Sequence, residues 1–210
     1  MRVALFHNLP PGGARRAMVE LVRRTSGVVT YDLYRIDGEG GSDRFVERPD
    51  DDLLPHVAEA RSYEGSARSP RVIEPALRVR RLNRLAAQIA ADIDAGGYDF
   101  AFVHHCRHTS SPAVLQHLRT PSIYFMQEPR RASFEYDRRP RPRRELPGPL
   151  ALQRLGIAAV EPLVRAADIS AARAADVVLC NSVFSAEAIW RAYGRAARVC
   201  GLGVDEQVFR

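Results

Sequence analysis

The sequence predicts an α/β fold, an open, doubly wound parallel sheet with helices on both faces. Short apolar runs alternate with longer segments of helical periodicity along the 210 residues. This alternation is typical of parallel strands that are joined by crossover helices. Several of the apolar runs end in polar or glycine-rich sequence, as strands that lead into ligand-binding loops do.

The first strand–helix–strand unit begins at the N-terminus. Residues 2–7 form an apolar run that ends in a Pro- and Gly-containing stretch at 8–13, which predicts a buried strand and a sharp turn. Apolar residues then recur at helical spacing over 14–24, and Gly27 ends this helix. The β-branched and aromatic run 28–34 predicts a second strand, which a right-handed crossover makes parallel to the first.

The rest of the chain continues the alternation. Strands are expected at 100–104, 122–126, 177–180 and 197–200, and helices at 76–95, 111–118, 150–174 and 185–193. The helix over 150–174 contains Pro162, which we expect to kink or split it. Residues 38–71 are polar and weakly patterned, so they predict a long surface connection with short elements.

The composition favours a cytoplasmic protein, although peripheral membrane contact stays open. No stretch approaches the roughly 20 apolar residues that span a bilayer, and the N-terminus lacks the pattern of a signal peptide. Three widely spaced cysteines suit small buried side chains better than disulfides. The net charge of +6 comes from arginine alone, the residue suited to forked recognition of phosphate and carboxylate.

An arginine-rich insert breaks the alternation. Residues 130–144 contain seven arginines and two prolines, so neither a helix nor a strand is expected there. One interpretation is a solvated loop. The other is a basic flap that meets an anionic acceptor, a lipid phosphate or a membrane surface. Nothing in the sequence resembles a known nucleic-acid-reading motif, so no nucleic-acid partner is expected.

Gly12 and Gly13 form the first candidate site. Glycines without Cβ let backbone amides approach a phosphate, and the N-terminus of the following helix favours anions. A plain tight turn explains the same pair equally well. We place Arg15, in the first turn of that helix, with the predicted substrate-binding residues. Neither a dinucleotide-binding glycine fingerprint nor a P-loop is present, which weakens an NAD-dependent function.

Histidines end the strand over 100–104. His104 is suited to bind a substrate hydroxyl or move a proton, and His105 follows it. Strand alternation would bring His104, Cys106 and His108 to one side, which invites a zinc interpretation. No second ligand cluster has the usual spacing, so no metal site is expected.

Two further strands end in polar residues. Gln127, Glu128 and Arg130 follow the strand over 122–126 and are predicted to line the same crevice as the histidines. Asn181 and Ser182 follow the strand over 177–180. They are candidate substrate-binding residues, while capping of the next helix is their alternative role.

These segments together resemble the N-terminal domain of GT-B glycosyltransferases, in particular the retaining group called family 4. Residues 2–6 with 11–14 look like that family's first strand and glycine loop, and 98–104 is similar to its Asp-x-x-x-x-His strand. Residues 174–182, with glycines and an aspartate near 203–205, read like its stretch before the interdomain linker. Phe102 and Gln127 stand where that family often has further histidines.

The resemblance implies a Rossmann-like acceptor-side domain over residues 1–210, with the linker near 200–210. The family's second domain, which holds the nucleotide-sugar, would be absent from this sequence, so we expect this chain alone to be inactive. The resemblance implies transfer of a hexosyl group from a nucleotide-sugar to an acceptor hydroxyl with retention of anomeric configuration. It implies no cofactor and no catalytic metal. His104 would be catalytic, and the acceptor could be anionic or lipid-linked. The alternative function is a non-catalytic Rossmann-like module that binds a phosphorylated ligand or a partner protein.

Overall fold

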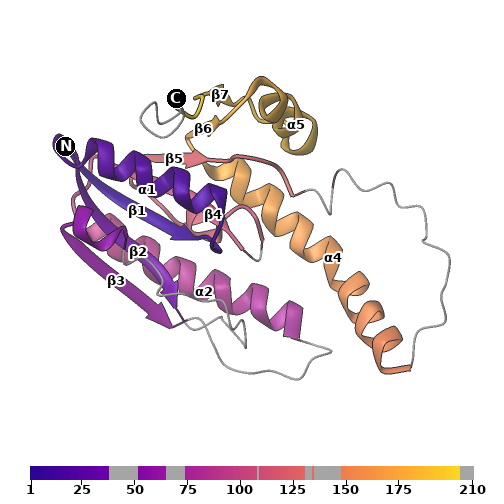
Figure 1. Cartoon of the computed structure of the whole chain (residues 1–210). Helices are drawn as coiled ribbons and strands as arrows, with labels where there is room; N and C mark the ends of the chain where they lie inside the picture. Colours follow the sequence, from indigo (N-terminus) through magenta and orange to yellow (C-terminus); the bar gives the residue numbers. More distant parts are fainter. Residues whose placement is uncertain (38–51, 65–73, 108, 131–133, 135–147, 204–210) are drawn as a thin grey trace.

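The chain folds around one seven-stranded, all-parallel sheet, which confirms the predicted fold class (Figure 1). The computed structural model describes residues 1–37, 52–64, 74–107, 109–130, 134 and 148–203. Most of the arginine-rich insert and the last seven residues therefore lie outside the described residues. The strand order is β3-β2-β1-β4-β5-β6-β7. The elements are β1 (Arg2–Asn8), α1 (Gly13–Thr25), β2 (Thr30–Asp37), η1 (Leu54–His56), β3 (Glu59–Glu64), α2 (Glu74–Ala95), β4 (Phe100–Cys106), η2 (Ala113–Gln116), β5 (Ser122–Phe125), α4 (Gly148–Ala174), β6 (Val177–Cys180), α5 (Val183–Tyr193) and β7 (Arg198–Val199).

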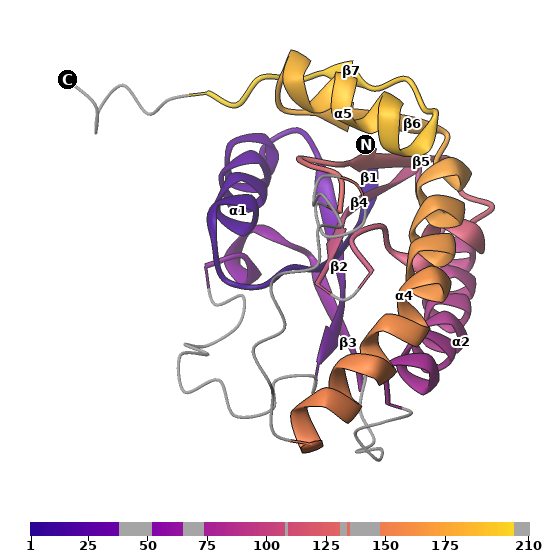
Figure 2. The ribbon, with the colours of Figure 1, turned by 90° about the vertical axis from the view of Figure 1, so that its right-hand side faces the viewer.

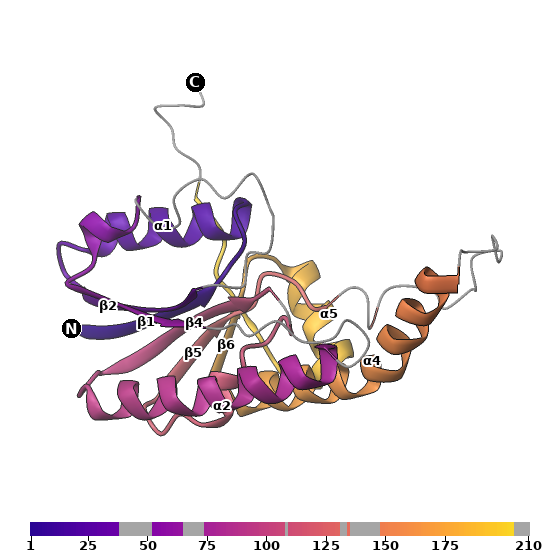
Figure 3. The same cartoon turned by 90° about the horizontal axis from the view of Figure 1, so that it is seen from below.

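Helices cover both faces of the sheet (Figures 2 and 3), and a hydrophobic core lies on each face. Helix α1 packs Met18, Val19 and Val22 on one face, against alternate residues of β1, β2 and β4. Helices α2, α4 and α5 cover the other face, where the remaining strand residues point. We call these the α1 face and the α2/α4 face. Strand alternation sends successive side chains to opposite cores.

The strand order reverses between β1 and β4. The chain leaves β1 toward the α1 face and enters β4 from α2 on the opposite face, so the two connections diverge there (Figure 3). In open parallel sheets, the carboxyl ends of the strands at such a switch point leave a crevice in which ligands bind. The residues that end β1 and β4 are therefore the first candidates for a ligand-binding site.

The prediction for residues 38–71 missed a strand. Glu59–Glu64 pairs in parallel with β2 and forms the edge of the sheet. Five of its six residues are exposed, so the segment lacks the apolar alternation that reveals a half-buried strand. Short, charged strands of this kind are how natural sheets protect an edge.

Two predicted helices also differ from the structure. The segment over 111–118 holds only the short 3-10 helix η2, because Pro112 is extended at its start and β5 follows closely. Helix α4 runs unbroken through Pro162, so of the expected kink or split the split does not occur. The N-terminal half of α4 extends beyond the sheet (Figure 3).

A buried carboxylate ties the amino ends of three strands together. Asp32 of β2 accepts hydrogen bonds from the Arg2 guanidinium at 2.6 Å and from the Tyr98 hydroxyl at 2.8 Å. Tyr98 also pairs with the Tyr34 hydroxyl at 2.9 Å, and Arg2 lies over the Tyr98 ring. Burial, Tyr34 and Asp32 together raise the pKa of Tyr98, so the phenol stays a donor. This cluster holds the amino ends of β1 and β2 to the start of β4.

Asp32→Ala should lower the free energy of unfolding by about 2–3 kcal/mol, because it leaves a buried phenol and a guanidinium without their shared acceptor. Urea denaturation measures the change. Glu59→Ala is the control, because it removes an exposed carboxylate 3.2 Å from Arg61 and should cost less than about 1 kcal/mol. Equal losses in the two variants would contradict the role of the cluster.

Candidate functional site

A β-bulge brings three histidines together at the switch point. Strand β1 pairs Phe6 with Val103 and then Asn8 with Cys106, so one residue of β1 opposes two of β4. The single residue is His7, and the two are His104 and His105. Bulges often lie beside active sites, where they redirect side chains. The bulge therefore concentrates imidazoles where the parallel-sheet rule places a ligand.

His104 is buried on the α1 face with one ring nitrogen unsatisfied. Its ring lies edge-on to Phe102 and Phe125, with centroid distances of 4.6 and 5.7 Å. The side chain is 1% exposed, and its Nε2 has no hydrogen-bond partner among the described residues. Burial lowers the pKa of His104 well below its usual range, and the nearby His7 and His105 lower it further. The ring is therefore neutral at neutral pH, and its Nε2 lies buried without a partner among the described residues.

His7 is the functional candidate that sequence reasoning missed. It is 4% exposed and follows Val3 and Leu5 on the α1 face of β1, next to His104. The Leu9 amide donates to its Nδ1 at 3.4 Å. A polar residue that continues the buried alternation at the carboxyl end of a strand was the available signal.

His105 points to the α2/α4 face instead. Its Nδ1 lies 3.1 Å from the Ser110 carbonyl oxygen and 3.2 Å from the Tyr124 hydroxyl. Burial lowers the pKa of His105, while the Ser110 hydrogen bond and the charge of Glu128 oppose that shift. His104 and His105 are thus neighbours in sequence that serve different faces of the sheet.

Helix α1 presents an uncapped N-terminus beside the histidines. Gly12 occupies its N-cap at φ 157° and ψ −174°, a conformation that is essentially restricted to glycine. No side chain caps the helix, and its first turn contains no acidic residue. A Cβ at Gly12 or Gly13 would meet no atom within 4 Å, so the space beside the α-carbons of both glycines is open. The loop meets the geometric needs of an anion site.

Gln127 joins β5 to this loop. Its side-chain nitrogen donates a long hydrogen bond of 3.5 Å to the Ala14 carbonyl in the first turn of α1. Arg15, in the same turn, pairs with Asp52 of the segment before η1. The structure therefore groups Gly12, Gly13, Gln127 and His104 on the α1 face.

Glu128 and Arg130 lie on the side of His105 rather than His104. Glu128 is exposed, and its charge acts on His105. The Arg130 guanidinium pairs with Glu161 of α4, and its backbone amide donates to the Tyr193 hydroxyl at 3.1 Å. Arg130 thus anchors the beginning of the arginine-rich insert to α4 and α5.

Asn181 and Ser182 begin helix α5. The Ser185 amide donates to the Ser182 hydroxyl at 3.1 Å, and the Ser185 hydroxyl donates to the Asn181 side-chain oxygen at 2.8 Å. Both side chains are engaged in this cap, which is the structural role that residues of these types commonly have. They follow β6, which lies two places from β4 in the sheet, and so lie apart from the histidine group.

A buried aspartate braces the loop that follows β4. Asp168 of α4 is fully buried and accepts from the Ser111 amide and the Tyr193 hydroxyl, each at 2.8 Å. Burial raises the pKa of Asp168, and these hydrogen bonds oppose the shift. Ser110, in the left-handed region at φ 64°, turns the loop back so that its amide and carbonyl pair with Cys106. The sequence offered no signal for Asp168, which stands within an alanine-rich helix.

The zinc interpretation gains no support. Within the described ranges, no group of three or more His, Cys, Asp and Glu side chains is arranged to hold a metal ion. The Cys106 sulfur instead accepts from the side-chain Nδ2 of Asn8 at 3.7 Å, and His108 lies outside the described residues.

The fold is similar to that of solved structures that contain UDP or UDP-glucose. Anabaena HepE in complex with UDP and glucose aligns over 100% of this chain and 46% of its own, with a TM-score of 0.50 and 15% identity. Medicago truncatula UGT71G1 complexed with UDP-glucose aligns over 96% and 51%, with a TM-score of 0.55 and 13% identity. A UGT transferase from Siraitia grosvenorii in complex with UDP aligns over 96% and 50%, with a TM-score of 0.51 and 11% identity.

These similarities establish the fold and nothing finer. The neighbours are GT-B glycosyltransferases, and the chain spans about half of their length. No family model and no curated protein matches the sequence. Among the helices that the structure describes, none is long and apolar enough to cross a membrane.

The buried His104 should make stability depend on pH. The folded chain holds this ring neutral, whereas the unfolded chain takes up a proton below a pKa of about 6.5. The stability that the neutral ring contributes is therefore present above that pH and lost as the pH falls below it. The slope should reach about 1.4 kcal/mol per pH unit for one proton.

Urea titrations between about pH 5 and 7.5 measure this slope. His104→Phe should lower the slope of the free energy of unfolding against pH by the amount that corresponds to one proton. The slope that His105 contributes should remain. A profile equally steep in the variant would show that His104 is not held neutral by the fold.

Proposed function

We propose that the chain is the acceptor-side half of a glycosyltransferase that moves a sugar from a nucleotide-sugar to an acceptor hydroxyl. The half that binds most of the donor would face the carboxyl edge of this sheet. The fold similarity supports the class, since HepE and UGT71G1 hold UDP and glucose or UDP-glucose in their structures. The sequence resemblance to retaining GT-B enzymes supports transfer with retention by a hexosyltransferase of the family 4 type.

One observation carries the proposal. A glycine-only backbone conformation at Gly12 leaves the N-terminus of α1 uncapped and open, and the buried, unsatisfied His104 lies at the adjacent switch point. The two features call for different parts of one ligand. The helix N-terminus suits an anion, and the neutral imidazole suits a hydroxyl group.

The open amides would donate hydrogen bonds to the leaving group. When a nucleotide diphosphate departs, negative charge accumulates on its oxygens, and fixed donors near that charge lower the barrier. The Gly13 and Ala14 amides, with the positive end of the α1 dipole, are such donors. They need no reorganisation, because the glycine conformation has already fixed them.

His104 would form a hydrogen bond with the reacting sugar or with the acceptor. A neutral imidazole can donate to or accept from a hydroxyl, and burial between Phe102 and Phe125 fixes its ring. His7 stands beside it and shapes the same wall. Gln127 and Glu128 would line the acceptor pocket. An anionic or lipid-linked acceptor, and contact with a membrane surface, would involve the arginine-rich insert.

His104→Ala should lower turnover of the enzyme that contains this chain by about a hundredfold, the range for loss of a group that acts in the transition state. Donor affinity should stay near its original value, because the other half holds most of the donor. Steady-state transfer from a nucleotide-sugar, with kcat and KM separated, measures both effects.

His56→Ala is the matched control, since His56 lies in η1 before β3 and away from the histidine group. Unchanged turnover in His104→Ala would remove this residue from the site. Absence of any sugar transfer by the unsubstituted enzyme, with binding of a phosphorylated ligand retained, would favour a non-catalytic module.

A further inference from the structure

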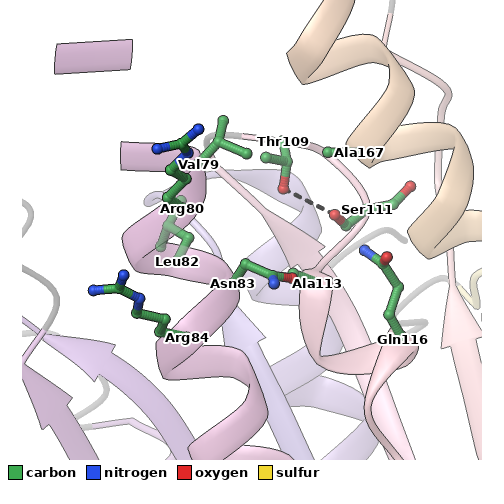
Figure 4. Close-up of a pocket in the computed structure, with 10 residues that line it drawn as sticks. All are labelled: Val79, Arg80, Leu82, Asn83, Arg84, Thr109, Ser111, Ala113, Gln116 and Ala167. Atoms are coloured by element: carbon green, nitrogen blue, oxygen red, sulfur yellow. Dashed lines mark hydrogen bonds between the residues drawn. The ribbon is translucent and has the colours of Figure 1, made fainter. Parts of the chain in front are cut away.

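We propose that a pocket on the α2/α4 face binds a small anionic sugar, such as a phosphorylated or carboxylated monosaccharide. The pocket has a volume of about 420 Å³ and lies between α2, the loop after β4, η2 and α4 (Figure 4). This volume falls within the range of about 300–1,000 Å³ that is typical of small-ligand sites. It opens on the opposite face of the sheet from the Gly12 loop.

Amide donors define the polar side of the pocket. The Asn83 side-chain oxygen lies 3.1 Å from His117 Nε2, and the Gln116 side-chain oxygen accepts from the Ser170 hydroxyl at 3.1 Å. Engagement of both oxygens fixes the amide orientations and leaves the two NH₂ groups free of described partners. Figure 4 shows the Gln116 nitrogen directed toward Ser111, across the hollow. A ligand with acceptor oxygens satisfies these donors.

Two arginines make the pocket cationic. Arg80 and Arg84, one helical turn apart on α2, line it and are exposed. Neither forms an ion pair with a residue that the structure describes, in contrast to Arg24 and Arg191, which pair with helix neighbours. Guanidinium groups match the geometry of phosphate and carboxylate. The anionic group of the ligand would therefore lie toward α2.

The remaining lining is apolar and suits the carbon face of a sugar. Val79, Leu82, Ala113 and Ala167 contribute small or aliphatic surface. Pockets that combine such surface with a few convergent donors select small, oxygen-rich molecules. A bare anion would use the arginines alone, and a neutral sugar would use the amides alone. The arrangement favours a ligand that carries both features.

The pocket wall is held by hydrogen bonds and extends to His105. The Thr109 hydroxyl donates to the Ser111 carbonyl at 2.8 Å, and the Asp168 carboxylate accepts from the Ser111 amide at 2.8 Å. Ser110, between them, contacts His105 through its carbonyl. This inference does not rest on the proposed function, because the pocket lies on the opposite face of the sheet from His104 and the Gly12 loop. The binding chemistry itself does not depend on catalysis.

Titration of the ¹⁵N-labelled chain with three probes tests the proposal. Glucose 6-phosphate should shift the side-chain amides of Asn83 and Gln116 and the backbone amides of Thr109 and Ser111. Glucose alone and inorganic phosphate alone should each bind at least about tenfold more weakly, because each lacks one set of contacts. Shifts centred on Gly12 to Ala14, or no shift at all, would overturn the pocket assignment.

Paired charge variants supply the control. Arg80→Ala/Arg84→Ala should weaken glucose 6-phosphate binding by about tenfold. Arg24→Ala/Arg191→Ala removes the same amount of charge from α1 and α5 and should leave glucose 6-phosphate binding unchanged. Ala167→Leu should also block binding by filling the pocket. Equal weakening by both double variants would show a general effect of net charge and overturn the proposal. If the pocket binds the probe but His104→Ala leaves transfer unchanged, only the proposed function fails.

Discussion

The divergence of the chain between β1 and β4 is the constraint on which the candidate site depends. Parallel strands deliver all their carboxyl ends to one edge, and only at the reversal of strand order do the connections leave that edge uncovered. The bulge at this point sets His7 opposite His104 and His105. The uncapped start of α1 lies at the same edge because α1 follows β1 directly. A different strand order would separate these features.

Buried polar groups hold this arrangement from both ends. Asp32 joins the amino ends of the central strands, and Asp168 fastens the loop after β4 to α4 and α5. Each carboxylate accepts two hydrogen bonds, and such partners are needed for a buried charge to stabilise a fold. His104 differs from both, because its Nε2 lies buried without a described partner. Such an unsatisfied group is a stability cost that binding of a hydroxyl would relieve.

The sequence predicted the helices and strands that are determined by residues within one short segment. Apolar runs located β1, β4 and β6, and the glycine loop located the start of α1, because burial and turn chemistry leave direct traces in composition. The edge strand Glu59–Glu64 left none, since its side chains are exposed. Chemistry at strand ends identified His104 and Gln127, which the fold brings to one face. The bulge, His7 and Asp168 depend on contacts between distant segments, so no single stretch of sequence reveals them.

The proposed function depends most directly on binding of the diphosphate of a nucleotide-sugar at the N-terminus of α1. Titration of the ¹⁵N-labelled chain with UDP at millimolar concentration, followed by backbone amide shifts, tests it. We expect saturable shifts at Gly13 and Ala14. Gly12→Ala should abolish these shifts and Gly13→Ala should keep them, since only Gly12 has a glycine-only conformation. Shifts that are absent, or that survive Gly12→Ala unchanged, would contradict binding at this N-terminus.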